Sequence, residues 1–349
     1  MIYYASMFEE FVDLRPFTTF KLGGKARYFV EIIDPTDIPR AFEFAREKNL
    51  SVFILGGGSN ILLSHDDVYE AVVIKMNITG FEPIDSEGDK ILIKIGAGEN
   101  WDEAVRKAVD LNLSGIESLS AIPGTAGATP VQNVGAYGTE ISDVLVNLDA
   151  YDIDNDRFVT LSNADCRFGY RDSIFKNEAK GKSVITAITL QLSKIPGVVP
   201  DYPGVKKYFA ENGSFADGSQ PSLADIRRAI IDIRRFKLPD PREIASVGSF
   251  FKNPIVSEEQ YHRLEKQFPG IIGYQLPGDR YKIGAGWLLE FLRFKGKQIG
   301  NLKFYNHNAL VLTNLGDATF RETIAVADQV RQSVMDTFGI ELEMEPLVV

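Results

Sequence analysis

Three glycine-rich segments, each close behind an apolar stretch, are the first features of this sequence that could do chemistry. They are Gly56-Gly57-Gly58-Ser59-Asn60, Gly96-Ala97-Gly98-Glu99-Asn100 and Ile283-Gly284-Ala285-Gly286. Glycine turns of this kind bring backbone N–H groups close to an anion, and a diphosphate suits them. Neither the GxGxxG fingerprint nor the GxxxxGK[ST] phosphate loop is present. Each segment alone is typical of an ordinary turn, but together they favour a phosphate-bearing ligand held by loops of another kind.

The segment 122–138 is dense in Gly, Ala and Pro and also carries hydrogen-bonding side chains. These are Thr125, Thr129, Gln132 and Asn133. A flavin ring needs small apolar residues over its face and backbone or amide groups at its polar edge. The alternative interpretation is a tight crossing inside a core, which leaves the adjacent Gln132 and Asn133 unexplained. No His or Cys lies in the segment, so we expect a flavin to be bound without a covalent link.

Composition narrows the class of protein. The chain has 349 residues, 44% hydrophobic and 25% charged, with a net charge of -10, which indicates a folded protein of two or three domains. The acidic balance argues against a nucleic-acid partner. The single cysteine, Cys166, and three scattered histidines give no support for a disulfide or a zinc site. No signal peptide and no run of ~18 apolar residues is present, so a cytoplasmic protein without a membrane partner is expected.

Hydrophobic periodicity and capping residues predict the elements that must position these loops. Strands are expected at 28–32, 51–55, 71–75, 91–95 and 309–313, and strands dominate 145–192. Helices are expected at 36–48, from Asn100, from Ser222, from Ser257, at 286–294 and at 319–338, where Gly339 ends the helix. The stretch 193–221 is expected to be a long loop with only a short helical turn, and 341–349 is strand-like.

Several short motifs in a fixed order resemble one enzyme family, the UDP-N-acetylenolpyruvoylglucosamine reductases. The motifs are Ile54-Leu55-Gly56-Gly57-Gly58-Ser59-Asn60, Gly96-Ala97-Gly98-Glu99-Asn100-Trp101, Ile122-Pro123-Gly124, Pro130-Val131-Gln132-Asn133-Val134-Gly135-Ala136-Tyr137-Gly138, Cys166-Arg167-Phe168-Gly169-Tyr170-Arg171-Asp172-Ser173-Ile174-Phe175-Lys176, Gly248-Ser249-Phe250-Phe251-Lys252-Asn253-Pro254, Ala285-Gly286-Trp287-Leu288 and Leu342-Glu343-Met344-Glu345. The resemblance extends from about residue 16 to the end of the chain.

The resemblance implies an α+β fold, with a two-part FAD-binding region of the vanillyl-alcohol-oxidase type and an appended α/β substrate-binding domain. It places FAD-binding subdomain 1 at 1–78, subdomain 2 at 79–237 with an inserted loop at 193–221, and the substrate-binding domain at 238–349. The C-terminal strand is expected to return to the active site. Because Tyr202 lies in the inserted loop, the chain resembles the longer type of the family, which has a tyrosine-bearing loop over the substrate.

The resemblance also implies a reaction. NADPH reduces a non-covalently bound FAD, and the flavin N5 then delivers hydride to the enolpyruvyl terminal carbon of UDP-N-acetylglucosamine enolpyruvate. The product is UDP-N-acetylmuramate, a peptidoglycan precursor of the bacterial cell wall. Three positions match the catalytic residues of the family. Arg171 would bind the carboxylate, Glu345 would stabilise the same negative charge, and Ser249 would donate the proton. Glu341 and Glu343 are close competitors for the role of Glu345.

Other family positions imply the binding residues. Those expected to bind the cofactor are Gly56, Gly57, Gly58, Ser59, Asn60, Pro123, Gly124, Thr125, Gly127, Ala128, Thr129, Gln132, Asn133 and Tyr137. Those expected to bind the substrate are Tyr202, Arg234, Lys237, Asn253, Lys282 and Asn308. A monomer is expected, although the sequence alone does not set the oligomeric state.

The sequence departs from the family pattern at two places and leaves two other functions open. Thr18-Thr19-Phe20 replaces an Asn-Thr-Phe motif, and Asn308 stands where a longer amide is usual. One alternative is an FAD oxidase of the same fold that uses oxygen, and the other is a catalytically silent protein that binds a nucleotide sugar. Rapid reoxidation by oxygen would favour the first alternative, and a colourless protein would favour the second.

Overall fold

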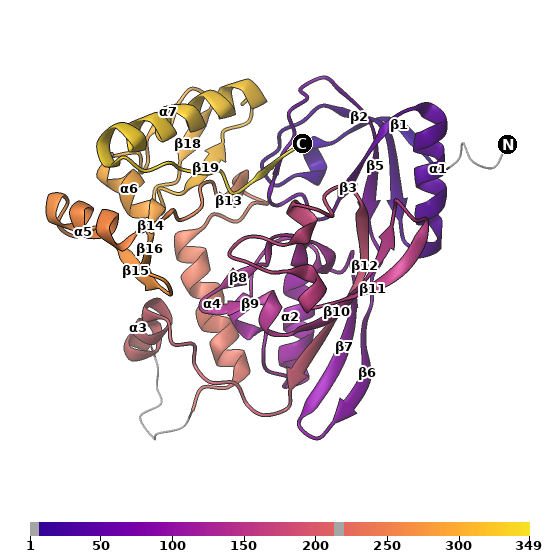
Figure 1. Ribbon diagram of the computed structural model, residues 1–349, viewed down its shortest axis with the longest axis horizontal. Helices are drawn as coiled ribbons and strands as arrows, with labels where there is room; N and C mark the ends of the chain where they lie inside the picture. The colour runs from indigo at the N-terminus through magenta and orange to yellow at the C-terminus, as the bar shows by residue number, and fades with distance from the viewer. Residues whose placement is uncertain (1–6, 213–219) are drawn as a thin grey trace. The chain divides into compact units, whose positions relative to one another are not determined.

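The computed structural model describes residues 7–212 and 220–349, which form two compact units. The first unit comprises the described residues within Met1–Val12, Ala26–Gly57 and Glu70–Arg234, and the second comprises Asp13–Lys25, Gly58–Tyr69 and Arg235–Val349. Figure 1 labels their elements and colours them along the chain. Both units mix helices with strands, as the expected α+β class requires.

A four-stranded sheet and one helix form the N-terminal part of the first unit. In spatial order its strands are β1 (Glu9–Asp13), β2 (Lys25–Ile32), β5 (Val68–Met76) and β3 (Ser51–Leu55). Helix α1 (Ile38–Lys48) connects β2 to β3 and buries Ile38, Phe42 and Ala45, which share one helical face. Because β3 and β5 are parallel, β5 ends beside the glycine loop that follows β3.

The N-terminus of α1 differs slightly from the sequence prediction, which starts the helix at Thr36. Asp34 instead accepts the N–H of Thr36 at 2.8 Å and initiates the short turn η2 (Pro35–Asp37). The α-helix follows only at Ile38. An aspartate before a proline can stabilise a turn of its own, so the helical pattern in the sequence begins earlier than the helix.

A five-stranded antiparallel sheet forms the rest of the core of the first unit. Its strand order is β11 (Arg157–Ser162), β10 (Leu145–Asp152), β12 (Ser183–Ser193), β7 (Lys90–Gly96) and β6 (Phe81–Glu87). Helix α2 (Trp101–Asp110) buries Trp101 and Val105 in the same core as Ile93 and Ile95. Asn100 accepts the N–H of Glu103 at 3.0 Å, so the predicted helix start at Asn100 is confirmed.

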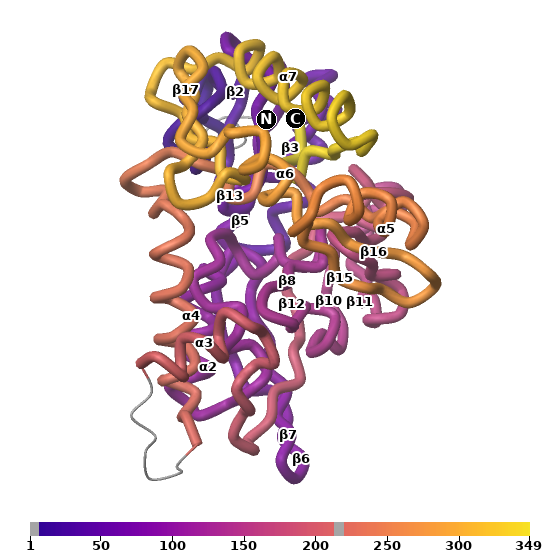
Figure 2. Tube along the Cα trace, turned by 90° about the vertical axis from the view of Figure 1, so that its left-hand side faces the viewer, coloured from indigo at the N-terminus to yellow at the C-terminus, as the bar shows by residue number. Residues whose placement is uncertain are grey.

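Two further helices of the first unit pack on each other. Helix α4 (Leu223–Lys237) begins after Ser222, as predicted, and Figure 2 shows it alongside α2 and α3. Helix α3 (Pro203–Asn212) lies within the stretch 193–221, so the expectation of a loop with only a helical turn there is wrong. Its Val205 is buried with Ile226 and Ile230 of α4, and this tertiary contact stabilises a helix whose own sequence signal is weak. Residues 213–219 lie outside the described residues.

Short turns and strands, rather than long elements, form the remaining described parts of the first unit. They are η3 (Glu117–Leu119), η4 (Ala126–Ala128), η5 (Pro130–Gln132), β8 (Gly135–Ala136), β9 (Thr139–Glu140), η6 (Ile141–Asp143), η7 (Ala164–Cys166) and η8 (Ile174–Lys176). Gly127, Ala128 and Gln132, three of the residues expected at the flavin, are in η4 and η5. Cys166 is fully buried in the surrounding core.

The second unit combines small sheets with three helices. One sheet has the order β13 (Ser246–Ser249), β19 (Val311–Asn314), β18 (Leu302–Phe304) and β17 (Gln298–Ile299), and another has β14 (Ile255–Ser257), β16 (Arg280–Ile283) and β15 (Gly273–Leu276). The helices are α5 (Glu258–Gln267), α6 (Ala285–Phe291) and α7 (Phe320–Phe338). Helix α7 ends at Gly339, whose φ of 64° confirms the predicted left-handed cap.

The division of the chain differs from the expected domain boundaries. The sequence assigns all of 1–78 to one FAD-binding subdomain, yet 13–25 and 58–69 belong to the second unit. The segment 13–25 contains η1 (Arg15–Phe17). The segment 58–69 contains β4 (Ile61–Leu62), which pairs with β20 (Leu347–Val348). Asn314 also donates from Nδ2 to the carbonyl of Phe20 at 3.0 Å. These partners lie hundreds of residues apart, so no local pattern in the sequence reveals them.

The C-terminal segment is less regular than its strand-like sequence suggests. Within 341–349 only Leu347–Val348 is a strand, and an isolated bridge joins Met344 to Phe251. The segment is nevertheless held along its length by backbone hydrogen bonds, including those from Glu345 to Phe250 and from Leu347 to Asn60.

Candidate active site

Two loops of the first unit meet through backbone rather than through side chains. A Cβ atom at Gly57 would lie 2.5 Å from Cα of Gly124, and one at Gly127 would lie 2.5 Å from Cβ of Ala97. Both distances are shorter than the contacts that a Cβ atom makes in folded proteins, so only glycine lets these backbone segments approach so closely. A Cβ at Gly56 would lie 2.8 Å from the Thr125 hydroxyl, which the glycine leaves uncovered. The resulting small-residue surface fits a flat cofactor with a diphosphate.

Lys75, which the sequence analysis did not single out, brings a cation to the first glycine loop. It lies near the end of β5 and donates from Nζ to the carbonyl oxygen of Gly56 at 2.8 Å. Burial lowers the pKa of its ammonium group, and the charge of Glu31 opposes that shift. A positive charge beside a backbone-lined loop suits the diphosphate of FAD. The sequence carried one signal for this residue: Lys75 ends the predicted strand 71–75, whose other residues are all apolar.

Asn133 and Thr129, both predicted to bind the cofactor, use their side chains within the protein. Asn133 is 1% exposed and donates from Nδ2 to Glu140 at 2.6 Å and to the Gly169 carbonyl at 3.1 Å. Its Oδ1 accepts the N–H of Ser142 at 3.1 Å. The Thr129 hydroxyl donates to the Ala126 carbonyl at 2.7 Å. The side chains of Asn133 and Thr129 therefore shape the loop through these hydrogen bonds.

Arg171 lies in a tight turn that Asn133 supports. Gly169 and Asp172 exchange backbone hydrogen bonds across the turn, and Arg171 adopts a left-handed φ of 53°. Its Nη2 donates to the carbonyl of Gly135 at 2.9 Å, and Lys176 Nζ donates to the Arg171 carbonyl at 3.0 Å. A non-glycine residue at positive φ is uncommon and is typical of functional sites. The half-buried guanidinium is thereby directed beside the small strand β8.

A second guanidinium, that of Arg234, lies in the same part of the first unit. Burial raises the pKa of the Tyr137 hydroxyl and the charge of Arg234 opposes that rise, and the ring of Tyr137 meets that of Tyr202 edge-on with centroids 5.2 Å apart. Burial lowers the pKa of Arg234, Tyr137 and Asp102 oppose the shift, and the charge of Arg171 lowers the pKa further. The structure thus brings together four predicted site residues, with two cations close enough to repel. An anion between such groups would relieve the repulsion.

Ser249 and Glu345, the other predicted catalytic residues, belong to the second unit and lie on adjacent segments. Ser249 ends β13, follows Gly248 with its φ of 75°, and pairs with Val311. The Glu345 N–H donates to the carbonyl of Phe250 at 3.0 Å. Asn60, expected at the cofactor, donates from Nδ2 to the Glu345 carbonyl at 3.3 Å. Ser249, Glu345 and Asn60 are therefore placed in one region of this unit.

Burial distinguishes Glu345 from its two competitors. Glu345 is half-buried, whereas Glu341 and Glu343 are exposed. Glu343 forms an ion pair with Lys252, and such a pair on the surface contributes little stability. The accessible but partly desolvated position of Glu345 is the one suited to stabilising charge on a bound substrate.

The remaining predicted substrate-binding residues have mixed surroundings in the second unit. Asn253 accepts the Ala285 N–H at 2.9 Å and so caps the start of α6, while Asn308 accepts the Leu310 N–H at 3.0 Å within a turn. The Lys282 ammonium lies 6.0 Å from the ring centroid of Tyr274. Lys237 is exposed at the end of α4. The side-chain oxygen of each asparagine accepts a hydrogen bond, and this fixes the direction in which its amide nitrogen points.

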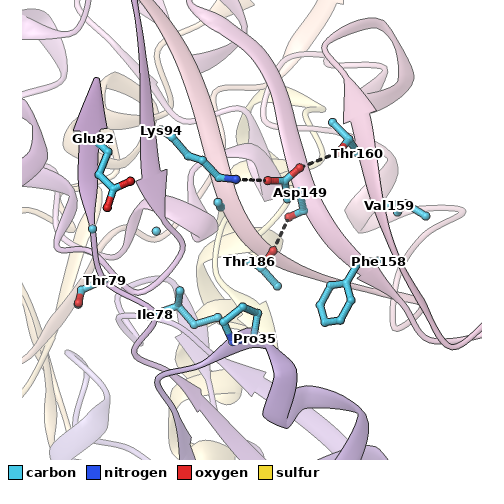
Figure 3. A pocket seen from close by; sticks show the side chains of 13 residues that line it. Pro35, Ile78, Thr79, Glu82, Lys94, Asp149, Phe158, Val159, Thr160 and Thr186 are labelled. Carbon is cyan, nitrogen blue, oxygen red and sulfur yellow. Dashed lines mark hydrogen bonds and ion pairs between the residues drawn. The ribbon is translucent and has the colours of Figure 1, made fainter. Parts of the chain in front are cut away.

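A separate pocket of about 380 Å³ lies on the five-stranded sheet of the first unit, and none of the predicted site residues lines it (Figure 3). Lys94 and Asp149 form an ion pair of 2.7 Å across its wall, and Thr160 donates to Asp149 at 2.7 Å. Thr186 donates to the Asp149 carbonyl at 3.1 Å. Lys94 and Asp149 of this wall thus already satisfy each other.

Comparison with known proteins assigns both parts of the chain. Residues 26–162 match a family model described as an FAD binding domain, and residues 240–349 match the C-terminal domain of UDP-N-acetylenolpyruvoylglucosamine reductase. The fold includes an FAD-binding region, and the chain is a flavoprotein that takes FAD. Among the described residues, no helix is long and apolar enough to cross a membrane.

Individual relatives extend the match to nearly the whole chain. The UDP-N-acetylenolpyruvoylglucosamine reductase of Chromobacterium violaceum is 40% identical over 338 residues, covering 97% of each chain. That of Neisseria gonorrhoeae is 42% identical over 337 residues, covering 96% of this chain and 95% of the relative. The crystal structure of UDP-N-acetylenolpyruvylglucosamine reductase from Thermus caldophilus superposes with a TM-score of 0.64 at 22% identity, covering 97% of this chain and 98% of that one. With identity near 40% over almost its full length, this chain belongs to the UDP-N-acetylenolpyruvoylglucosamine reductase family.

Proposed function

We propose that this protein reduces UDP-N-acetylglucosamine enolpyruvate to UDP-N-acetylmuramate, with NADPH as the electron donor, in the cytoplasmic synthesis of peptidoglycan precursors. The observation that carries the proposal is the pair of guanidinium groups in the FAD-binding unit: Arg171 donates to the Gly135 carbonyl and Arg234 to the Ala121 carbonyl. A substrate with a carboxylate and a diphosphate supplies the negative charges that such a site needs.

The residues of the first unit would hold the cofactor and the substrate carboxylate. The loops around Gly57 and Gly124 offer a backbone-lined surface for FAD, and Lys75 adds a cation near its diphosphate. FAD, bound without a covalent link and reduced by NADPH, supplies the hydride from N5 for the enolpyruvyl terminal carbon. Arg171 would bind the carboxylate through charge-assisted hydrogen bonds and stabilise the enediolate charge that develops on it.

The residues of the second unit would complete the reaction. Negative charge on the substrate must be removed by a proton delivered to the carbon that bears the ether oxygen, and Ser249 would donate it. Serine is a weak acid, but the receiving carbon is strongly basic, which offsets that weakness. Glu345, half-buried next to the segment of Ser249, would stabilise the same charge as a hydrogen-bond donor when protonated.

The UDP part of the substrate would be recognised by basic, amide and aromatic groups. Lys237 and Lys282 would contact the phosphates as cations. Asn253 would direct its amide nitrogen toward the same region, because its oxygen is held by the Ala285 N–H. Tyr202 would close over the diphosphate from the segment that carries α3, consistent with its contact to Tyr137.

Separate measurement of the two half-reactions tests this function. The purified protein should be yellow, and NADPH should bleach it under anaerobic conditions. UDP-N-acetylglucosamine enolpyruvate should then restore the colour stoichiometrically. Restoration by oxygen alone, with none by the UDP-sugar, would favour an oxidase. A protein that remains colourless after incubation with FAD would favour a binding protein without catalysis.

A further inference from the structure

The residue just before the proposed flavin loop, Ala121, has an unusual conformation. Its φ is 57°, in the left-handed region where an alanine is uncommon and carries a conformational cost. Ala121 directly precedes Ile122-Pro123-Gly124, so its backbone sets the direction in which the loop starts. A strained residue at such a place persists only when its surroundings hold it.

Both polar backbone atoms of Ala121 are held by charged side chains. The N–H donates to Oδ1 of Asp102 at 2.6 Å, and the carbonyl oxygen accepts from Nε of Arg234 at 3.3 Å. Asp102 is the second residue of α2, and Arg234 lies in the last turns of α4. Side chains of two helices thus hold the peptide groups on both sides of Ala121.

Asp102 is itself held in place by Arg227. The Arg227 guanidinium donates to both carboxylate oxygens, at 2.6 and 3.0 Å, and its side chain is only 12% exposed. Bidentate pairs of this kind fix orientation as well as distance. Burial alone raises the pKa of Asp102, but hydrogen bonds from Arg227 and Ala121, together with the charges of Arg227 and Arg234, outweigh it and lower the pKa. The carboxylate therefore stays ionised at neutral pH.

Arg234 joins the two ends of the loop. Besides donating to the carbonyl of Ala121, it acts through its charge on Tyr137, near the end of the segment 122–138, and opposes the rise that burial causes in the pKa of the Tyr137 hydroxyl. Hydrogen bonds therefore connect Asp102 to Ala121 and Ala121 to Arg234. They link the start of the loop to one of the two guanidinium groups, those of Arg171 and Arg234, between which an anion would bind. A shift of Asp102 would be transmitted to the start of the loop and to Arg234.

We propose that Asp102, oriented by Arg227, is a positioning residue that presets the flavin loop for FAD by clamping the backbone of Ala121. The proposal rests on the proposed role of 122–138 in binding the flavin. Neither Asp102 nor Arg227 touches the reacting atoms in this account. Their contribution is to hold the loop in its binding conformation before FAD arrives, so that binding does not have to order it.

The test compares FAD affinity in four variants of the full chain, using apoprotein and the quenching of flavin fluorescence. Asp102→Ala removes the acceptor for the Ala121 N–H and should raise the dissociation constant of FAD about tenfold or more. Asp102→Asn keeps an oxygen acceptor and should stay within about threefold of the wild type. Arg227→Met leaves the carboxylate unsupported and should give an intermediate loss.

Glu103→Ala is the matched control. Glu103 is also acidic, lies in the same first turn of α2, and its carboxylate pairs with the exposed Arg106. This substitution should lower the melting temperature of the apoprotein by the amount expected when one negative charge is lost from a helix N-terminus. It should leave FAD affinity unchanged. If Asp102→Ala and Glu103→Ala have equal FAD affinities, the clamp is refuted and Asp102 serves only the helix.

A fifth variant separates the clamp from the loop assignment itself. Gly124 has a φ of 122°, so Gly124→Ala strains the loop directly. Weak FAD binding in Gly124→Ala with normal binding in Asp102→Ala would overturn the clamp and leave the proposed function intact. Normal binding in both variants would show that 122–138 does not hold the flavin, and both proposals would fail together.

Discussion

The backbone N–H of Glu345 donates to the carbonyl oxygen of Phe250, the residue after Ser249, with nitrogen and oxygen 3.0 Å apart. This bond ties a residue four positions from the C-terminus to the end of β13. It brings the segments of Ser249 and Glu345, almost one hundred residues apart in the sequence, next to each other, as the proposed roles of these two residues require. The same region receives Asn60 through its bond to the Glu345 carbonyl.

Substitution of Ser249 should separate the two half-reactions. In Ser249→Ala, NADPH should bleach the flavin at nearly the normal rate, because that step needs no proton donor for the enolpyruvyl group. Return of colour with the UDP-sugar should slow by ~10²–10⁴-fold, and Ser249→Cys should recover part of the rate. Anaerobic stopped-flow absorbance measures both steps.

Ser257→Ala is the control for Ser249, since the Ser257 hydroxyl only caps α5 through the Gln260 N–H at 3.1 Å. It should cost about 1 kcal/mol of stability and leave both rates unchanged. Near-normal reoxidation in Ser249→Ala would assign the proton to water or another residue.

The two glutamates near the C-terminus should behave differently. Glu345→Ala should slow reoxidation about 10²–10³-fold, because a donor near the developing charge is lost. Glu343→Ala removes an exposed partner of Lys252 and should change neither half-reaction. Equal effects of the two substitutions on the reoxidation rate would contradict the assignment of Glu345.

Asn133 should contribute to stability even without cofactor. Asn133→Ala removes three hydrogen bonds of a buried amide at a φ of 45°, and we expect a loss of about 3 kcal/mol in the unfolding free energy of the apoprotein. Urea unfolding measures the loss, and Asn155→Ala in an exposed turn is the control. A variant with normal apoprotein stability but weak FAD binding would instead make the amide a flavin ligand.

Tyr202 should affect the UDP-sugar and not NADPH. Tyr202→Phe keeps the ring contact with Tyr137 and removes the hydroxyl, so KM for the UDP-sugar should rise while flavin reduction stays normal. Tyr208→Phe, on α3, is the control, because its hydroxyl is bonded to Asp232 at 2.7 Å within the helix pair. Unchanged KM values for both substrates in Tyr202→Phe would exclude the closing role.

Cys166 should resist modification in the folded protein. Burial, together with the negative charge of Asp165, raises the pKa of its thiol to about 11. The reactive thiolate is therefore scarce until the pH approaches that value, whereas in the unfolded chain it forms nearer the ordinary pKa. Iodoacetamide should label the native protein very slowly at pH 8 and rapidly in urea, as mass spectrometry can follow. Fast native labelling at pH 8 would contradict this environment.

Much of the local structure and the family of the chain could be predicted from the sequence. The starts of α2 at Asn100 and α4 at Ser222, and the end of α7 at Gly339, depend on interactions within one helical turn. The motifs around Arg171 and Ser249 identified the family, because their residues are contiguous in the chain. Such signals need no knowledge of distant partners.

Only the tertiary structure decided how those residues are used. The side-chain amide of Asn133, expected at the flavin, forms hydrogen bonds with Glu140, Gly169 and Ser142. Helix α3 forms because α4 provides an apolar face for Val205. The hydrogen bonds of Ala121 to side chains of α2 and α4, and the place of 58–69 in the second unit, likewise depend on residues far along the chain. The physical reason is range: caps and periodicity act over three or four residues, whereas buried polar groups are satisfied by whichever partners the folded core brings to them.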